Sequence, residues 1–175
     1  MSKVVTKKVR LSYLNVFEAR SQEGGEAKFS VCVIVPKTDK ATLEKLHAAV
    51  EETKLEGKTK KWGGKIPNGL KLPIRDGDEE RPDKEEFKNA YFFNASSKIK
   101  PLVLDTDGEP LLDNSELYSG CYGRVSVNLY PYDVSGSKGV AVGLNAVKKV
   151  ADGERLAGSG ASAADFDDDE AEWMK

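Results

Sequence analysis

The sequence predicts a mainly β (α+β) fold: a five-stranded, partly open barrel with one helix after the second strand. Three observations support it: several segments alternate apolar and polar residues, one segment carries an apolar stripe with the helical period, and glycine-rich turns separate them. With 175 residues, 39% of them hydrophobic, and a mean hydropathy of -0.51, the chain suits one domain with appendages and no membrane insertion.

Two strands open the chain. Residues 4–17 alternate, with Tyr13 on the same side as two aliphatic residues, and residues 22–26 form the hairpin loop. The return strand spans residues 27–35, and Pro36 ends it. This pair is the predicted start of the barrel.

One helix and one long loop follow. Thr38 or Asp39 caps a helix with an apolar stripe of leucines and a valine, and Gly57 is its predicted end. Residues 58–89 are irregular and charged, with lysines, several prolines and an acidic run, so we expect an inserted loop with a functional role.

A second β region completes the barrel. Residues 91–97 and 102–105 are predicted strands, and residues 123–129 and 140–146 alternate on either side of a Gly-Ser turn. The inward row of the last strand ends at Ala146, with Lys149 outward. An OB-fold is the leading candidate, although the usual OB-fold helix follows the third strand.

The composition changes after Asp152 to glycine, alanine, serine and acids. This change predicts a folded domain over residues 1–152 and a flexible linker with a disordered acidic tail over residues 153–175. Residues 165–175 hold six acids and one base, which leaves 26 bases and 23 acids in the body. The formal net charge of -2 therefore hides a mildly basic domain, which is compatible with nucleic-acid binding.

The most informative pattern is an outward row on the strand that starts near residue 122. Its members are Tyr122, Arg124, Ser126, Asn128 and Tyr130, with no acid among them. Tyrosines offer stacking surfaces for bases, and a guanidinium pairs bidentately with phosphate, so the row suits a single strand of nucleic acid. The alternative is that the tyrosines cover a second layer of the barrel or pack beneath the long loop.

Other aromatic and basic residues extend this interface. Phe92 and Lys98 share one phase of their strand, but the sequence does not decide which face of this strand meets a ligand. Trp62 is either an anchor of its loop or a stacking platform. The complete candidate DNA-binding set is Tyr122, Arg124, Asn128, Tyr130, Tyr132, Phe92, Lys98, Trp62, Lys61, Lys65, Lys8 and Arg10.

The tail combines acids with two aromatic residues. A solubilising end needs no tryptophan, so we expect a docking peptide for protein partners that also competes for the basic surface. The candidate partner-binding residues are Phe166, Asp167, Asp168, Asp169, Glu170 and Trp173.

The sequence offers no convergent catalytic or metal-binding set. His47 is the only histidine, and Cys32 and Cys121 are expected to be small buried residues, because no C-x-x-C or neighbouring histidine accompanies them. We therefore expect a protein that is not an enzyme and that has no metal or cofactor.

The chain resembles phage-encoded single-stranded-DNA-binding proteins with an OB-fold core. The resemblance is carried by residues 90–97 (AYFFNASS), 118–132 (YSGCYGRVSVNLYPY) and 138–150 (KGVAVGLNAVKKV), and by the acidic C-terminus. It implies strand coating during phage DNA replication or recombination, with Tyr122, Arg124 and Tyr130 as binding positions. In one departure, bacterial-type tails end in a short apolar tip, whereas Lys175 ends this chain.

The expected function is sequence-tolerant binding of single-stranded DNA in the host cytoplasm. The expected partners are single-stranded DNA and, through the tail, replication or recombination proteins, with a homodimer left open and no membrane partner. The alternative is a protein-interaction module whose acidic tail mimics DNA to recruit or inhibit a host enzyme.

Overall fold

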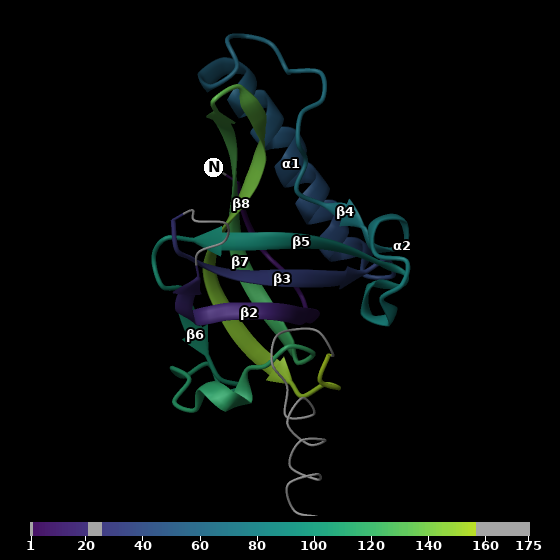
Figure 1. Ribbon diagram of the computed structural model, residues 1–175, viewed down its shortest axis with the longest axis vertical. Coiled ribbons are helices and arrows are strands. Elements are labelled where there is room, and N and C mark those ends of the chain that lie inside the picture. The colour runs from purple at the N-terminus through teal and green to yellow at the C-terminus, as the bar shows by residue number, and fades with distance from the viewer. Residues whose placement is uncertain (1, 21–25, 157–175) are drawn as a thin grey trace, which may run out of the picture.

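A computed structural model describes residues 2–20 and 26–156 (Figure 1). The strands are β1 (Ser2–Val5), β2 (Val9–Arg20), β3 (Lys28–Pro36), β4 (Arg75–Asp76), β5 (Ala90–Ser97), β6 (Leu102–Leu104), β7 (Tyr122–Val134) and β8 (Ser137–Ala151). The helices are α1 (Lys40–Lys60) and α2 (Gly77–Glu80), with the 3-10 turns η1 (Glu85–Phe87) and η2 (Asn114–Glu116).

Five of these strands close a barrel in the order β2-β3-β5-β8-β7, because β7 also pairs with β2. The closure is partial: β5 and β8 meet through one parallel pair, Ser96 with Gly143. In Figure 1, β2, β3 and β5 lie across the long β7–β8 hairpin. The predicted OB-fold-like barrel, with its helix after the second barrel strand, is therefore confirmed, and β1, β4 and β6 extend it.

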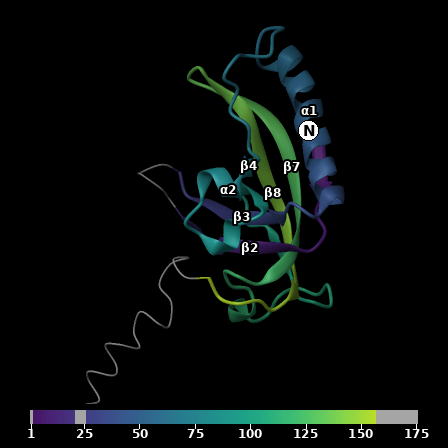
Figure 2. The ribbon, with the colours of Figure 1, turned by 90° about the vertical axis from the view of Figure 1, so that its right-hand side faces the viewer.

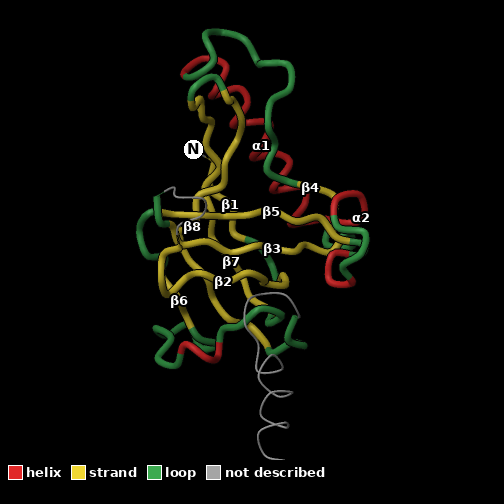
Figure 3. The backbone as a smooth tube through the Cα atoms, viewed as in Figure 1, coloured by secondary structure: helices red, strands yellow, loops and turns green. Residues whose placement is uncertain are grey.

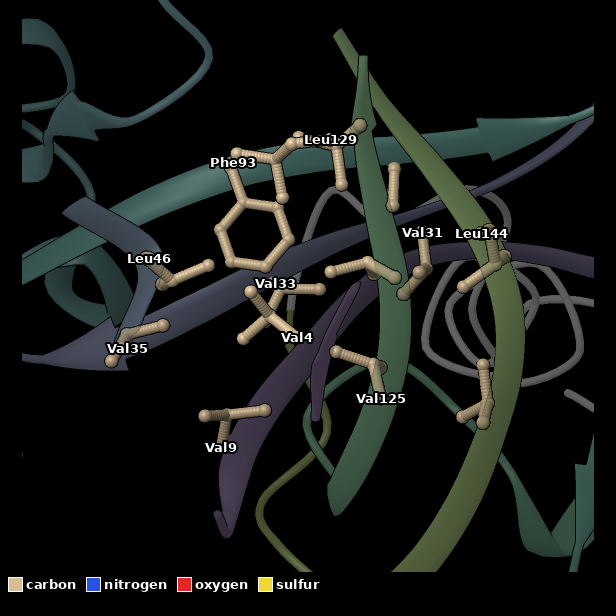
Figure 4. Packing of buried hydrophobic residues seen from close by; sticks show 14 of the residues in the cluster. Val4, Val9, Val31, Val33, Val35, Leu46, Phe93, Val125, Leu129 and Leu144 are labelled. Carbon is tan, nitrogen blue, oxygen red and sulfur yellow. The ribbon is translucent and has the colours of Figure 1, made fainter. Parts of the chain in front are cut away.

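The core of the barrel consists mainly of the residues that point inward from its strands (Figure 4). Val33, Val127 and Leu129 are fully buried, and burying such a side chain contributes about 1.5–3 kcal/mol. A second cluster covers the outer side of β3 and β5, where Ile34 and Phe92 pack against Phe87. This cluster thus closes that end of the outer side of the sheet to solvent.

Both cysteines are buried thiols without a disulfide, as the sequence predicts. Burial raises the pKa of Cys32 to about 12 and also raises the pKa of Cys121. These two side chains therefore act as small core residues.

Helix α1 begins as predicted but ends later. The Asp39 carboxylate caps it by accepting a hydrogen bond from the Thr42 backbone N–H at 3.2 Å. The helix then continues through Gly57 to Lys60, so the predicted end at Gly57 is wrong. Gly57 is required for packing: a Cβ there would lie 2.7 Å from Pro131 Cβ and from the Trp62 ring. Figure 2 shows α1 running beside the β7–β8 hairpin.

The segment predicted as one irregular loop, residues 58–89, contains regular structure. Its first three residues belong to α1, and β4, α2 and η1 lie within the remainder. Residues 61–74 are a true loop (Figure 3), and Lys71 joins it to β8: its N–H donates to Lys138 O at 3.1 Å and its carbonyl accepts from Val140 N at 2.9 Å. The loop is therefore attached to the hairpin along one edge.

The β7–β8 hairpin is longer than predicted, with strands of 13 and 15 residues. Its register shifts between Ser126, which pairs with Ala146, and Val127, which pairs with Leu144. The extra residue between them reverses the alternation of the last part of β8. The prediction of Lys149 as outward is therefore wrong: Lys149 is buried, and its ammonium group pairs with Asp152 at 2.6 Å.

Candidate nucleic-acid interface

The outward row on β7 is present as predicted. Val125, Val127 and Leu129 are fully buried, while the residues between them are half-buried or exposed. Opposite this row, β8 presents mainly glycine and alanine: Gly139, Ala141, Gly143 and Ala146 pair with Tyr132, Tyr130, Asn128 and Ser126. Large side chains on one strand thus lie beside small ones on the next.

Two tyrosines use this space on the hairpin, beyond the barrel. A Cβ on Gly139 would lie 2.6 Å from Tyr132 Oη, and a Cβ on Gly143 would lie 3.5 Å from Tyr130 Cε1. Each ring therefore occupies the volume above a glycine of the neighbouring strand and is held there. This arrangement explains why both tyrosines are half-buried, and the remaining exposed part of each is accessible to a ligand.

Trp62 is the anchor of its loop. It is 5% exposed, packs in the main core beside Gly57, and its indole N–H donates to Tyr132 O at 3.1 Å. Its interpretation as a stacking platform is therefore wrong, because no face of the ring is available. The indole instead supports the backbone of a strand that carries a candidate stacking residue.

The prediction of Phe92 as a DNA-binding residue is also wrong. It is 2% exposed and packs edge-to-face against Phe87 at a centroid distance of 5.0 Å. The sequence leaves undecided which face of this strand meets a ligand; Phe92 lies on the outer side of the sheet, but the inserted segment that includes η1 covers this part of the sheet. Phe93, in the opposite phase, lies in the main core.

A basic cluster lies at the other end of β7. Lys8 Nζ is 5.1 Å and Arg10 Cζ is 5.7 Å from the centroid of the Tyr122 ring, so both cations interact with it. On the same strand, Arg124 Nε donates to Thr6 O at 2.9 Å. The structure therefore brings together four predicted residues from β2, β7 and the turn before β2.

The remaining predicted polar residues are spread more widely. Lys61 and Lys65 are exposed in the loop attached to the hairpin, whereas Lys98 is exposed near the end of β5 and pairs with Glu26 at 3.1 Å. Asn128 Nδ2 donates to Asn145 Oδ1 at 3.2 Å. These lysines thus lie in separate segments instead of in one cluster.

Sequence reasoning missed a polar strip on the outer side of β2, β3 and β5. Asn15 Nδ2 donates to Ser30 Oγ at 3.3 Å, and Ser30 pairs in register with Ser96, which pairs with Gly143. The strip therefore continues directly to the outer side of the hairpin near Tyr130. The alternation of Asn94 and Ser96 in the sequence was the available signal.

Tyr13 borders this strip, although the sequence predicts it on the inward side. It has a φ of 48° and is 38% exposed, and Lys84 Nζ donates to its hydroxyl at 3.0 Å. The register of β2 against β3 shifts between Ser12 and Asn15, which turns Tyr13 outward. The simple alternation over residues 4–17 is therefore wrong from this point.

Residues 152–156, here called the C-terminal strap, cross the end of the barrel after β8. The Tyr118 hydroxyl is 3.0 Å from both the N and O atoms of Gly153, and Leu156 packs on the second cluster. The predicted linker begins at residue 153, and its first four residues thus contact the barrel. The tail candidates Phe166, Asp167, Asp168, Asp169, Glu170 and Trp173 lie outside the described residues.

Within residues 2–20 and 26–156, no group of three or more histidine, cysteine or acidic side chains is placed to hold a metal ion. In the same part of the chain, no helix is long and apolar enough to span a membrane.

A partly open barrel whose outward strand face carries half-buried tyrosines and, at one end, a basic cluster is typical of OB-fold-like nucleic-acid-binding domains. A model of the family described as Enterobacter phage Enc34, ssDNA-binding protein, matches residues 2–174, and the chain belongs to this family. Protein p50 of Acyrthosiphon pisum secondary endosymbiont phage 1 is 33% identical over 178 residues, which cover 95% of this chain and 93% of p50.

Solved structures share the fold. The single-stranded DNA-binding protein from bacteriophage Enc34, in complex with ssDNA, has a TM-score of 0.78 and 27% identity, covering 89% of each chain. The structure of gp2.5, a single-stranded DNA binding protein encoded by bacteriophage T7, has a TM-score of 0.63. The similarity to gp2.5 covers 93% of this chain and 98% of gp2.5 at 15% identity, so it shows the fold alone.

Proposed function

We propose that this protein binds single-stranded DNA with little sequence preference and has no catalytic activity. The observation that carries the proposal is the pair of hairpin tyrosines, Tyr130 and Tyr132, each held above a glycine of β8. Stacking of a base on an aromatic ring contributes about 1–3 kcal/mol and tolerates any base. Arg124, Lys61 and Lys65 supply cations for the backbone, and the Enc34 relative, solved in complex with ssDNA, supports the assignment.

The biological role proposed for this activity is coating of single strands during phage DNA replication or recombination, in the host cytoplasm. The acidic tail then contacts replication or recombination proteins and competes with DNA for the basic surface. Family membership supports this role, and the segregation of acids to residues 165–175 supports the tail's part in it.

Binding is tested by fluorescence anisotropy of a labelled oligo-dT, titrated at several salt concentrations. Because Trp62 is buried, quenching of its fluorescence is a poor readout, and the label belongs on the DNA. We expect binding that weakens as salt rises, and about 10-fold or greater weakening when Tyr130 and Tyr132 are both changed to alanine. Absence of binding at low salt contradicts the proposal, as does nuclease activity with magnesium.

The alternative, a module whose tail mimics DNA, is separated by deleting residues 165–175. A strand-binding protein binds oligo-dT equally or more tightly after the deletion, because a competing anion is removed. A DNA mimic loses its activity on a host enzyme and gains nothing on DNA. Only the first result agrees with the function proposed here.

A further inference from the structure

A groove of about 180 Å³ lies at the end of the barrel where β2 pairs with β7. Three cations line it, Lys8, Arg10 and Lys88, with one acid, Glu86, and the ring of Tyr122. Lys88 has an ion-pair partner, Glu85, at 3.0 Å. Among the described residues, no carboxylate lies within ion-pair distance of Lys8 or Arg10, so these two charges are available to an anion.

The ring of Tyr122 is placed differently from the rings on the hairpin. Lys8 and Arg10 lie over it at 5.1 and 5.7 Å from its centroid. The C-terminal strap closes it from another direction, because a Cβ on Gly153 would lie 2.9 Å from Tyr122 Cε2. The ring of Tyr122 is thus already in contact with two cations and the strap, and its role here is to hold the two cations in place.

The orientation of Arg10 is fixed by backbone carbonyls. Its Nε donates to Gly120 O at 3.2 Å, and an Nη2 hydrogen donates to Glu154 O at 2.8 Å. These bonds use two of the five N–H groups of the guanidinium and do not neutralise its charge. Gly120 and the strap fit closely, since a Cβ on Gly120 would meet Glu154 O. The strap thus fixes the guanidinium of Arg10, which lines the groove.

We propose that Lys8 and Arg10 form a subsite for a backbone phosphate of DNA, and that Tyr122 is a positioning residue instead of a stacking residue. This inference rests on the proposed function and divides the interface in two. Tyr130 lies eight positions after Tyr122 on β7, a length of about 26 Å along the strand. One end of the interface holds charge, and the other stacks bases.

The two subsites differ in how their loss changes the salt dependence of binding. Each phosphate contact to a single strand contributes about 0.7 to the slope of log K against log salt. In the full chain, Lys8→Gln/Arg10→Gln should lower that slope by about 0.7, because one phosphate contact is lost, and weaken oligo-dT binding about 10-fold or more at low salt. Tyr130→Ala/Tyr132→Ala should weaken binding with the slope unchanged.

Controls separate charge at the groove from charge in general. Lys45→Gln/Lys100→Gln removes the same charge from exposed positions outside the groove and should leave the slope unchanged. Tyr122→Phe should bind as the wild type, while Tyr122→Leu should lose part of the slope with little change in melting temperature. If the Lys8/Arg10 variant keeps the wild-type slope while the Tyr130/Tyr132 variant is weakened, the subsite is rejected and the proposed function stands. If the wild type does not bind, the proposed function itself fails.

Discussion

At the scale of single residues, glycines decide where the tyrosines lie. Gly139, Gly143 and Gly153 each face a tyrosine ring, so the rings rest on backbone where a side chain would otherwise stand. The three sites differ in how closely the ring approaches. That difference allows a direct test with one methyl group.

Gly139→Ala and Gly143→Ala form a matched pair. The added methyl at Gly139 would lie 2.6 Å from both Tyr132 Oη and Lys71 O, whereas at Gly143 it makes an ordinary contact at 3.5 Å. We expect Gly139→Ala to destabilise the fold by about 1–3 kcal/mol and to weaken oligo-dT binding, and Gly143→Ala to change stability little. Urea unfolding and DNA titration measure both effects; equal stability of the two variants would contradict the arrangement of Tyr132.

At the scale of elements, α1 and the loop over residues 61–74 brace the hairpin from two directions. Gly57 brings α1 against Pro131, Trp62 bonds to the backbone of Tyr132, and Lys71 pairs with the start of β8. An isolated two-stranded hairpin is only marginally stable in water. The brace therefore explains how the hairpin keeps its two tyrosines in place beyond the barrel.

Gly57→Ala tests the brace. In an exposed helix interior this change stabilises a protein by about 1 kcal/mol. Here we expect a loss of about 1–3 kcal/mol, because the new Cβ would lie 2.7 Å from Pro131 Cβ and from the Trp62 ring. Thr59→Ala, at an exposed position of the same helix, is the control and should be neutral or slightly stabilising. A stability gain at position 57, measured by urea unfolding, would show that the contact is not tight.

At the scale of the whole molecule, the C-terminal strap links the end of the barrel to the tail. The pKa of Asp152 is lowered by its hydrogen bond with Lys149 and then by that with Tyr118. A carboxylate whose pKa is lower in the folded state stabilises the fold above its unfolded pKa, and that contribution is lost as the pH falls through the folded value. Acid should therefore loosen the strap.

Asp152→Asn measures this contribution. At pH 7 the variant should be less stable than the wild type, since it leaves the buried Lys149 without its anionic partner. The difference should shrink from about pH 4 downward, where aspartate becomes protonated. Denaturant unfolding at a series of pH values gives the comparison, with Asp107→Asn, in the exposed turn after β6, as the control. A stability difference independent of pH would contradict the role of the ion pair.

Local patterns in the sequence determined the strands, the Asp39 cap, the inward row of β7 and the segregation of acids to the end of the chain, because each depends on residues near one another in the chain. Tertiary structure alone decided which aromatic residues are accessible. Phe92 and Trp62 carry the same local signals as stacking residues, but η1 and α1 bury them. The register shifts that turned Tyr13 outward and Lys149 inward arise from pairing between strands. Burial and register depend on contacts between distant segments, and the period of one strand carries no information about them.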